Sequence, residues 1–406
     1  MSFEQGLSGL NVAAKNLDAI GNNVANASTI GYKSERAEFA DVFASSLAGA
    51  GGAQVGIGAK VAAVRQQFTQ GNITTTSNPL DVAINGGGFF RLSTNGTVSY
   101  ARNGQFALDQ NGFVVASNGA RLTGYPADTN GQIVASTPVD LQVSLANIAP
   151  RTTSTANLAL NLDARATAPT SAFSLTNPAS YNSSTAMTVY DSQGNSHTLT
   201  TYYVKTASNA WNVYGAADGS VLNGGAAIGA LNFSAGGTLA ADVTMNTSIA
   251  LTNGAASPLA IPITYPASDM TQFGVDFAVS KLQQDGYTTG TLAGFAVGTD
   301  GTILGRYTNG QSRAQGQMVL ANFVNPQGLV SMGNNQWAES ADSGQALVAT
   351  PGAGTLGVLQ SGALEDANVD LTEELVNMIT AQRAYQANAQ TIRTQDQIQQ
   401  TLVNLR

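Results

Sequence analysis

The amino-acid sequence predicts a mixed fold: long α-helices at the N- and C-terminal ends form a coiled-coil inner domain, and β-rich middle and outer domains lie between them. Two observations carry this prediction. Both ends of the chain place apolar residues at the alternating spacing of three and four that is typical of a coiled-coil helix. The sequence between the ends is divided instead by Asn-Gly pairs, which favour tight turns between antiparallel strands.

The first predicted helix begins near Ser2, which is followed three residues later by Gln5 as in a capping box. Its apolar stripe is weak only at Gly21. The stripe consists of Phe3, Leu7, Leu10, Ala14, Leu17 and Val24, with Ile20 beside it. We expect this stripe to be an interface, because its spacing matches a coiled-coil seam.

The last predicted helix follows the same pattern and has a matching cap at Asp370 and Glu373. Its apolar stripe resumes after a slip in the spacing. The stripe consists of Leu371, Leu375, Met378, Gln382, Tyr385, Ala389 and Ile392, with Ile379 beside it and Ile398, Leu402 and Leu405 after the slip. The opposite face is polar and uncharged, which suits the lining of an aqueous channel. The candidates for that lining are Gln386, Gln390, Gln397 and Gln400.

The position of these stripes at the ends of the chain favours assembly. Isolated helices are marginally stable in water, so terminal helices need an external surface. We expect the two helices to pair with each other and with neighbouring copies of the chain. Burying six such apolar side chains contributes on the order of 10 kcal/mol before the entropy of ordering is subtracted. The sequence therefore predicts a self-assembling homopolymer.

The interior of the chain reads as β structure. Asn-Gly pairs at Asn95, Asn103, Asn111 and Asn118 recur every seven or eight residues, which predicts type I′ turns in a β-meander. In a second β region, strands at 186–190 and 198–204 flank the turn at 191–194, and Trp211 and Tyr214 are expected to close its core. Residues 215–256 are rich in small residues and read as short strands on long loops.

Composition excludes several classes of function. The net charge of −8 disfavours binding to nucleic acid and to anionic membranes. The sequence contains no run of about 18 apolar residues, which a membrane-spanning helix would need. The N-terminal sequence lacks the basic start and apolar core of a secretory signal peptide. The absence of cysteine excludes a disulfide framework. Only 10% of residues are charged, so neutral polar residues cover the surface, as suits a protein buried against its own copies.

No arrangement of residues predicts catalysis, and we expect no enzyme activity, no cofactor and no metal site. His197 is the only histidine and is expected to be a partly exposed structural residue, because metal sites and general bases both need convergent partners. A secreted polysaccharide-acting enzyme or an adhesin is the alternative from another class. Either would need a convergent acidic or aromatic site that the sequence does not indicate.

Long motifs at both ends resemble the flagellar rod and hook axial protein family. At the N-terminal end these are residues 7–10 (LSGL), 16–26 (NLDAIGNNVAN) and 29–33 (TIGYK). At the C-terminal end they are residues 362–365 (GALE), 368–371 (NVDL) and 381–386 (AQRAYQ). Residues 80–84 (LDVAI), 88–90 (GFF) and 402–406 (LVNLR) resemble the hook members in particular. The alternative within the family is a distal rod protein, which typically lacks the domain inserted here after about residue 146.

The resemblance implies a division into four parts. These are a terminal helical coiled-coil domain (1–26 and 370–406), a connecting region (27–71 and 359–369), a middle β domain (72–146 and 286–358) and an inserted outer β domain (147–285). It also implies a structural subunit of a flexible tubular universal joint, which transmits torque from the basal-body rod to the filament and provides the export channel.

The resemblance further implies the partners and the location of the protein. The partners would be other hook subunits, the distal rod protein, the hook cap protein, the hook–filament junction proteins and the flagellar type III export apparatus. The location would be extracellular, in the flagellum, after export without a cleaved signal peptide.

Overall fold

The computed structural model describes residues 2–42, 56 and 58–404. The chain divides into two compact units. The terminal unit contains residues 1–145, 294–306 and 312–406, and the inserted unit contains residues 146–293 and 307–311. Leu405 of the predicted stripe and residues 43–55 and 57 of the predicted connecting region lie outside the described residues. The division into four parts remains a prediction.

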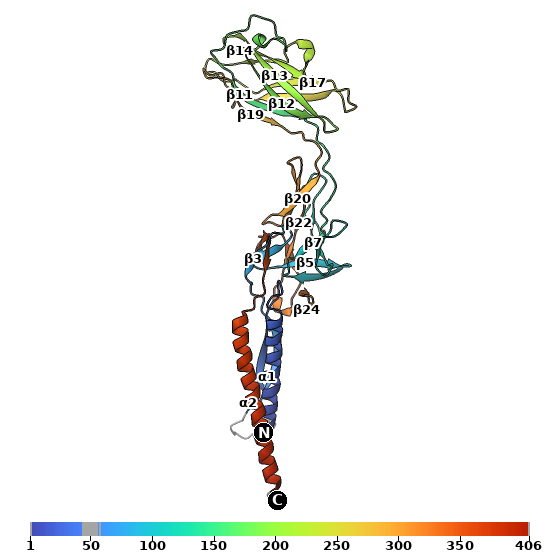
Figure 1. Cartoon of the computed structure of the whole chain (residues 1–406), viewed down its shortest axis with the longest axis vertical. Helices are drawn as coiled ribbons and strands as arrows, with labels where there is room; N and C mark the ends of the chain where they lie inside the picture. Colours follow the sequence, from blue (N-terminus) through green and yellow to red (C-terminus); the bar gives the residue numbers. More distant parts are fainter. Residues whose placement is uncertain (1, 43–55, 57, 405–406) are drawn as a thin grey trace. The chain divides into compact units, whose positions relative to one another are not determined.

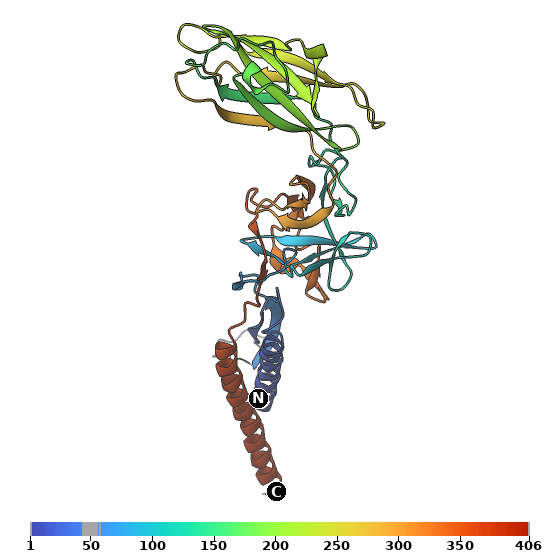
Figure 2. The ribbon, with the colours of Figure 1, turned by 45° about the horizontal axis from the view of Figure 1, so that its top comes forward.

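A helix lies at each end of the chain, as predicted (Figure 1). Helix α1 is Ser2–Ala25, and helix α2 is Leu371–Asn404. The Asp370 cap is confirmed, because its Oδ1 accepts hydrogen bonds from the backbone N–H groups of Thr372 at 2.8 Å and Glu373 at 3.2 Å. The two helices run antiparallel and side by side, and α2 continues past the start of α1 (Figures 1 and 2).

The terminal unit is built on one large sheet with the strand order β20-β21-β22-β9-β5-β6-β25-β24, to which β7, β8, β10, β23 and β26 attach. The strands to residue 140 are β5 (Phe89–Thr94), β6 (Thr97–Ala101), β7 (Phe106–Leu108), β8 (Val114–Ala116), β9 (Arg121–Pro126) and β10 (Val139–Asp140). The others are β20 (Leu292–Val297), β21 (Thr302–Tyr307), β22 (Ser312–Met318), β23 (Leu320–Asn322), β24 (Val330–Gly333), β25 (Gln336–Ala338) and β26 (Leu347–Ala349). A 3₁₀ turn, Pro326–Gly328, precedes β24.

Three antiparallel strand pairs connect this sheet to the terminal helices. They are β1 (Glu35–Val42) with β2 (Gly58–Gln66), β3 (Ile73–Thr75) with β28 (Ala363–Glu365), and β4 (Val82–Asn85) with β27 (Val358–Ser361). The last two pairs join sequence that follows α1 to sequence that precedes α2. The N- and C-terminal parts of the chain therefore reach the large sheet together.

Aromatic residues fill one core of the terminal unit. Phe89, Tyr100, Phe323 and Trp337 are buried together, and Phe68 packs against them. Their rings meet edge to face, with centroids 5.5 Å apart for Phe68 and Trp337 and 4.8 Å apart for Tyr100 and Phe323. Tyr100 of this core belongs to β6, which ends one residue before Arg102, so the core fixes the position of that end of the strand.

The inserted unit is a sandwich of two sheets. The first sheet has the order β17 (Val243–Ile249), β18 (Leu259–Tyr265), β11 (Ala156–Asn161) and β19 (Ala278–Gln284), in which β11 and β18 are parallel. The second has the order β12 (Ser183–Tyr190), β13 (Ser196–Ala207), β14 (Ala210–Ala217) and β15 (Ser220–Val221), with β16 (Gly229–Asn232) also paired to β14. The 3₁₀ turns of this unit are Pro178–Ser180 and Asn223–Gly225.

One apolar core joins the two sheets of the sandwich. Leu158 and Ile263 contribute from the first sheet, and Leu199 and Trp211 from the second. The expected strands on either side of the 191–194 turn are confirmed as β12 and β13, and the core position of Trp211 is confirmed. Tyr214 is not a core residue. It is only partly buried and stacks on Phe173, with ring centroids 4.2 Å apart.

The Asn-Gly pairs form turns of more than one kind. Asn95 has a φ of 50° and Gly96 a φ of 86°, as a type I′ turn between β5 and β6 requires. At Asn111 and Asn118 only the following glycine has a positive φ. The type I′ prediction is therefore wrong at Asn111 and Asn118, and also at Asn103, where neither Asn103 nor Gly104 has a positive φ. Gly104 is needed instead for a close approach, since a Cβ there would lie 1.7 Å from the Val82 carbonyl oxygen.

Candidate assembly interface and helix–sheet junction

The face of α1 that packs on α2 is built from small residues. A Cβ added to Gly6 would lie 3.0 Å from Ile392 Cγ1, and one added to Gly9 would lie 2.7 Å from Asn388 Oδ1. Ala13 and Ile20 follow at the same three-four spacing and are buried. The two helices of one chain therefore pair as expected, but through a face offset by one residue from the predicted stripe.

The predicted stripe of α1 is left partly uncovered. Phe3 and Leu7 are each 45% exposed. Leu10, Leu17 and Val24 are partly buried, and Ile20 alone is buried, because it lies on the α2-facing side. The hairpin of β1 and β2 contacts a further side of α1, where the Ser8 hydroxyl accepts a hydrogen bond from Ala59 N–H at 3.3 Å. Large apolar side chains of α1 thus remain available to a further partner.

The face of α2 that points away from α1 carries both the predicted apolar residues and the candidate channel-lining glutamines. Ala381 is buried on the side of α1, as Asn388 and Ile392 also face α1. Leu371, Leu375, Ile379 and Tyr385 are exposed, and Met378 and Ile392 are partly buried. Gln386, Gln390, Gln397 and Gln400 are exposed. The side chain of Leu402 lies outside the described part of the chain.

The expected separation of apolar and glutamine faces on α2 is wrong. Leu375 and Gln386 are eleven residues apart, about three helical turns, so they share one face. That face changes along its length, from apolar residues near the start of α2 to glutamines further on.

The bases of the helices are tied together by a buried polar residue on α1. Asn23 is 2% exposed, and its Oδ1 accepts hydrogen bonds from the Glu35 N–H at 2.7 Å and the Tyr32 hydroxyl at 3.2 Å. Its Nδ2 donates to the carboxylate of Glu374 on α2 at 2.8 Å. One amide therefore links α1, the start of β1 and the first turn of α2.

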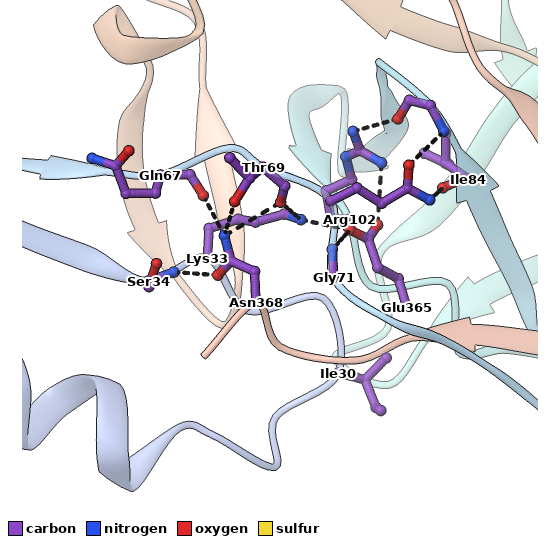
Figure 3. Close-up of polar contacts among 12 residues, drawn as sticks. Ile30, Lys33, Ser34, Gln67, Thr69, Gly71, Ile84, Arg102, Glu365 and Asn368 are labelled. Atoms are coloured by element: carbon purple, nitrogen blue, oxygen red, sulfur yellow. Dashed lines mark hydrogen bonds and ion pairs between the residues drawn. The ribbon is translucent and has the colours of Figure 1, made fainter. Parts of the chain in front are cut away.

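Next to this amide lies a cluster that we call the helix–sheet junction, made of Lys33, Arg102, Glu365 and Asn368 (Figure 3). The Lys33 ammonium lies 2.6 Å from Glu365 Oε1, and Arg102 Nη1 lies 3.1 Å from Glu365 Oε2. The side chains of Lys33 and Glu365 are 0% exposed and that of Arg102 is 4% exposed. Burial lowers the pKa of the Lys33 ammonium and of the Arg102 guanidinium, while Glu365 acts in the opposite direction.

Backbone groups complete the junction. Lys33 donates to the Thr69 carbonyl at 2.7 Å, and Arg102 Nη2 donates to the Gly86 carbonyl at 2.8 Å (Figure 3). Asn368 accepts from the Ser34 N–H at 2.7 Å and donates to the Gln67 carbonyl at 2.7 Å. None of these four residues was predicted as part of a site. The sequence did mark two of them, because charged residues are rare in this chain and Lys33 and Glu365 lie in its N- and C-terminal motifs.

Neither unit presents a recognisable catalytic arrangement among the residues that the structure describes. No group of three His, Cys, Asp or Glu side chains in that part of the chain could hold a metal ion. His197 is partly exposed and lies between the carboxylates of Asp191 and Asp218. Within the described helices, none is long and apolar enough to span a bilayer.

Family models match the chain in order along its length. Residues 3–33 match the model described as flagella basal body rod protein, and residues 83–159 match the flagellar hook protein FlgE/F/G D1 domain. Residues 161–287 match the flagellar basal body protein FlaE D2 domain, and residues 360–405 match the flagellar basal body rod FlgEFG protein C-terminal model.

Whole-length relatives decide the identity. The chain is 46% identical over 411 residues to the flagellar hook protein FlgE of Escherichia coli strain K12, with all of both chains covered. The chain belongs to the flagellar hook protein family. Among other hook proteins of this family, the one from Salmonella typhimurium is 45% identical over the whole of both chains. The one from Borreliella burgdorferi is 33% identical, covering all of this chain and 99% of the relative.

A solved hook protein supports the fold. The crystal structure of Helicobacter pylori flagellar hook protein FlgE2 matches 72% of this chain and 100% of its own, with a TM-score of 0.51 and 13% sequence identity. The hook protein family thus accounts for a β-rich chain with a helix at each end. The coiled-coil geometry of those helices remains a prediction.

Proposed function

We propose that this chain is a structural, non-enzymatic subunit of the bacterial flagellar hook. It would assemble with its own copies into a flexible tube that transmits torque from the basal-body rod to the filament and provides the export channel. The observation that carries the proposal is the 46% identity to a hook protein over the full length of both chains.

The uncovered apolar face of the terminal helices supports assembly between copies. Phe3, Leu7, Leu375 and Ile379 are exposed in the single chain although they are large and apolar. Burying such a side chain contributes about 1.5 to 3 kcal/mol. A neighbouring subunit with the same face can supply that burial repeatedly, which favours a homopolymer. The uncovered residues of the two predicted stripes are therefore proposed as subunit contacts, whereas Ile20 and Ile392 already pack between α1 and α2 of one chain.

The glutamines on the outward face of α2 support an aqueous channel. Gln386, Gln390, Gln397 and Gln400 carry no charge and are exposed. An uncharged polar lining would stay hydrated without holding a charged polypeptide in transit. We assign the terminal helices to the inner wall of the tube, the middle β domain to its body and the inserted β domain to its outside.

The remaining partners follow from a place in the flagellum. A hook subunit would contact the distal rod protein at one end of the tube and the hook–filament junction proteins at the other. It would be exported by the flagellar type III apparatus and assembled under the hook cap protein, in an extracellular location. The low charge of the chain is compatible with subunit contacts that exchange as the tube bends.

Electron microscopy of the purified polymer tests the proposal. The full-length chain should form hollow tubes that curve and supercoil. Straight, rigid rods would contradict it and would instead fit a rod protein. Failure to polymerise, even with short lengths of native hook as seeds, would count against any axial role.

A further inference from the structure

The helix–sheet junction contains more buried positive charge than negative charge. Lys33 and Arg102 are both nearly inaccessible, and the Glu365 carboxylate is the acidic group bonded to either of them among the described contacts. Their remaining partners are the neutral carbonyls of Thr69 and Gly86. The Arg102 Nε is buried and has no hydrogen-bond partner in the described structure. The cluster therefore depends on a single carboxylate.

Glu365 also holds the backbone around it. Its Oε1 accepts a hydrogen bond from the Gly71 N–H at 2.9 Å, and its main-chain carbonyl accepts one from the Gly31 N–H at 2.7 Å. A Cβ at Gly31 would lie 2.6 Å from the Asn103 backbone nitrogen, so this segment lies directly against the end of β6. One residue thus contacts segments that lead to α1, to β3 and to the large sheet.

Lys33 and Glu365 come from opposite ends of the chain. Lys33 and Glu365 are 332 positions apart, and Glu365 comes only five residues before the Asp370 cap of α2. Without the C-terminal segment, two cations near the base of α1 have no acidic partner. Leaving a buried charge uncompensated costs far more than an exposed ion pair contributes. Docking of the C-terminal segment therefore decides whether the N-terminal segment can stay buried.

We propose that Glu365 is the closing anchor of the terminal unit. By neutralising Lys33 and Arg102 together, it fixes the segments at the bases of both terminal helices to the large sheet as one body. This role belongs to the single folded chain and does not depend on the proposed assembly. In the tube proposed above, the same anchor would transmit force from the helices to the β domain.

The test compares three variants of the full-length monomer by hydrogen exchange at Gly31 and Gly71. Glu365→Gln keeps the size of the side chain but leaves two unpaired cations, so exchange at both amides should accelerate at least about tenfold. Adding Lys33→Met removes one of those cations, so the double variant should exchange more slowly than Glu365→Gln alone. Asp140→Asn is the matched control, since it removes a carboxylate from the partly exposed pair with Arg121 in the same unit and should change neither amide.

The rescue distinguishes a charge anchor from a packing role. If Glu365 acted only through packing, a second core substitution would add to the damage, and a double variant that exchanges faster than Glu365→Gln overturns the proposal. Wild-type exchange rates in Glu365→Gln also overturn it. If Glu365→Gln alone is insoluble, recovery of a soluble folded chain by Lys33→Met supports the anchor, and insolubility of both variants contradicts it.

Discussion

His197 in the inserted unit is held between two carboxylates. Its Nδ1 lies 2.6 Å from Asp218 Oδ2, and its Nε2 lies 3.3 Å from Asp191 Oδ2. Desolvation lowers the pKa of His197, but hydrogen bonds to Asp218 and Asp191 outweigh it and raise the pKa above the ordinary value of 6.5. Asp191 also accepts from Asn253 at 2.7 Å, so the cluster pins the loop before β18.

We predict that the inserted unit loses stability as the pH rises from 6 to 9. Because the folded pKa of His197 lies above its unfolded value, its contribution is complete below about pH 6.5 and is lost through the folded pKa. A neutral imidazole carries a proton on only one of its two nitrogens, so one of the two carboxylates then faces the lone pair of the other nitrogen. His197→Gln should remove this dependence and cost roughly 1.5 to 3 kcal/mol near pH 6.

Thermal unfolding followed by Trp211 fluorescence, in a Trp337→Phe background, measures this unit separately. Hydrogen bonds, the largest of them to His197, lower the carboxyl pKa of Asp218 despite burial, so its own contribution is complete above about pH 3.8 and is lost as the pH falls below that value through the folded pKa. The two effects therefore occur on opposite sides of the range tested. If the unfolding temperature changed equally with pH between 6 and 9 in wild type and in His197→Gln, His197 would not be the cause of the pH dependence.

At the scale of secondary-structure elements, the register of α1 against α2 rests on the contact between Gly9 and Asn388. Only a glycine leaves room for the Asn388 side chain at this point of the seam, so displacing one helix along the other would bring a larger residue of α1 against Asn388. We predict that Gly9→Cys combined with Asn388→Cys forms an intrachain disulfide under oxidation, since a Cβ at residue 9 would lie 2.9 Å from Asn388 Cγ. The chain itself has no cysteine, so the two introduced cysteines can form a disulfide within one chain only with each other.

Leu7→Cys with Asn388→Cys is the matched control for this cross-link. Leu7 lies on the exposed stripe of α1, so this pair should give little intrachain product. Mass spectrometry after non-reducing digestion identifies the linked peptides. Equal intrachain yields from the two pairs would mean that the helices have no fixed register in the chain.

The helices were predictable from sequence because each carries its own periodic signal and Asp370 supplies a local cap. Their pairing faces were not predictable, because the residues that meet are Gly6, Gly9 and Asn388, which a search for apolar periodicity passes over. The same limit applies to the turns. Asn95 and Asn103 are each followed by a glycine, yet only Asn95 forms a type I′ turn. At Asn103 the glycine packs against Val82 instead, which is a tertiary contact that the local sequence does not indicate.

The helix–sheet junction could not have been found from spacing. Lys33 and Glu365 meet across 332 residues, so no local spacing in the sequence pairs one with the other. The motifs that contain them were visible in the sequence, but the physical reason for them appears only when both ends of the chain are folded together. Sequence patterns thus predicted the elements better than the contacts between distant elements.

At the scale of the whole molecule, the terminal helices and the rest of the chain differ in how much of their apolar surface is covered. The sandwich of the inserted unit buries Leu158, Trp211 and Ile263 almost completely. The pairing of α1 and α2 uses small side chains and leaves Leu7 and Leu375 45% exposed. Since most helix stability in proteins comes from packing of an apolar face, the helices should be the least stable part of the lone subunit.

We therefore predict that the helices are protected much more strongly in the polymer than in the monomer. Backbone amides of residues 7–24 should exchange at least about tenfold faster in the monomer than in the polymer, while those of β13 and β14 change little. Leu375→Asp is the control, because its charge is tolerated on the exposed face of the monomer but would be buried in a subunit contact. At a concentration at which wild type polymerises, this variant should remain monomeric and keep the fast exchange. Strong protection of residues 7–24 in the wild-type monomer would mean that one chain suffices to hold its own helices, and the uncovered stripe would then need another explanation.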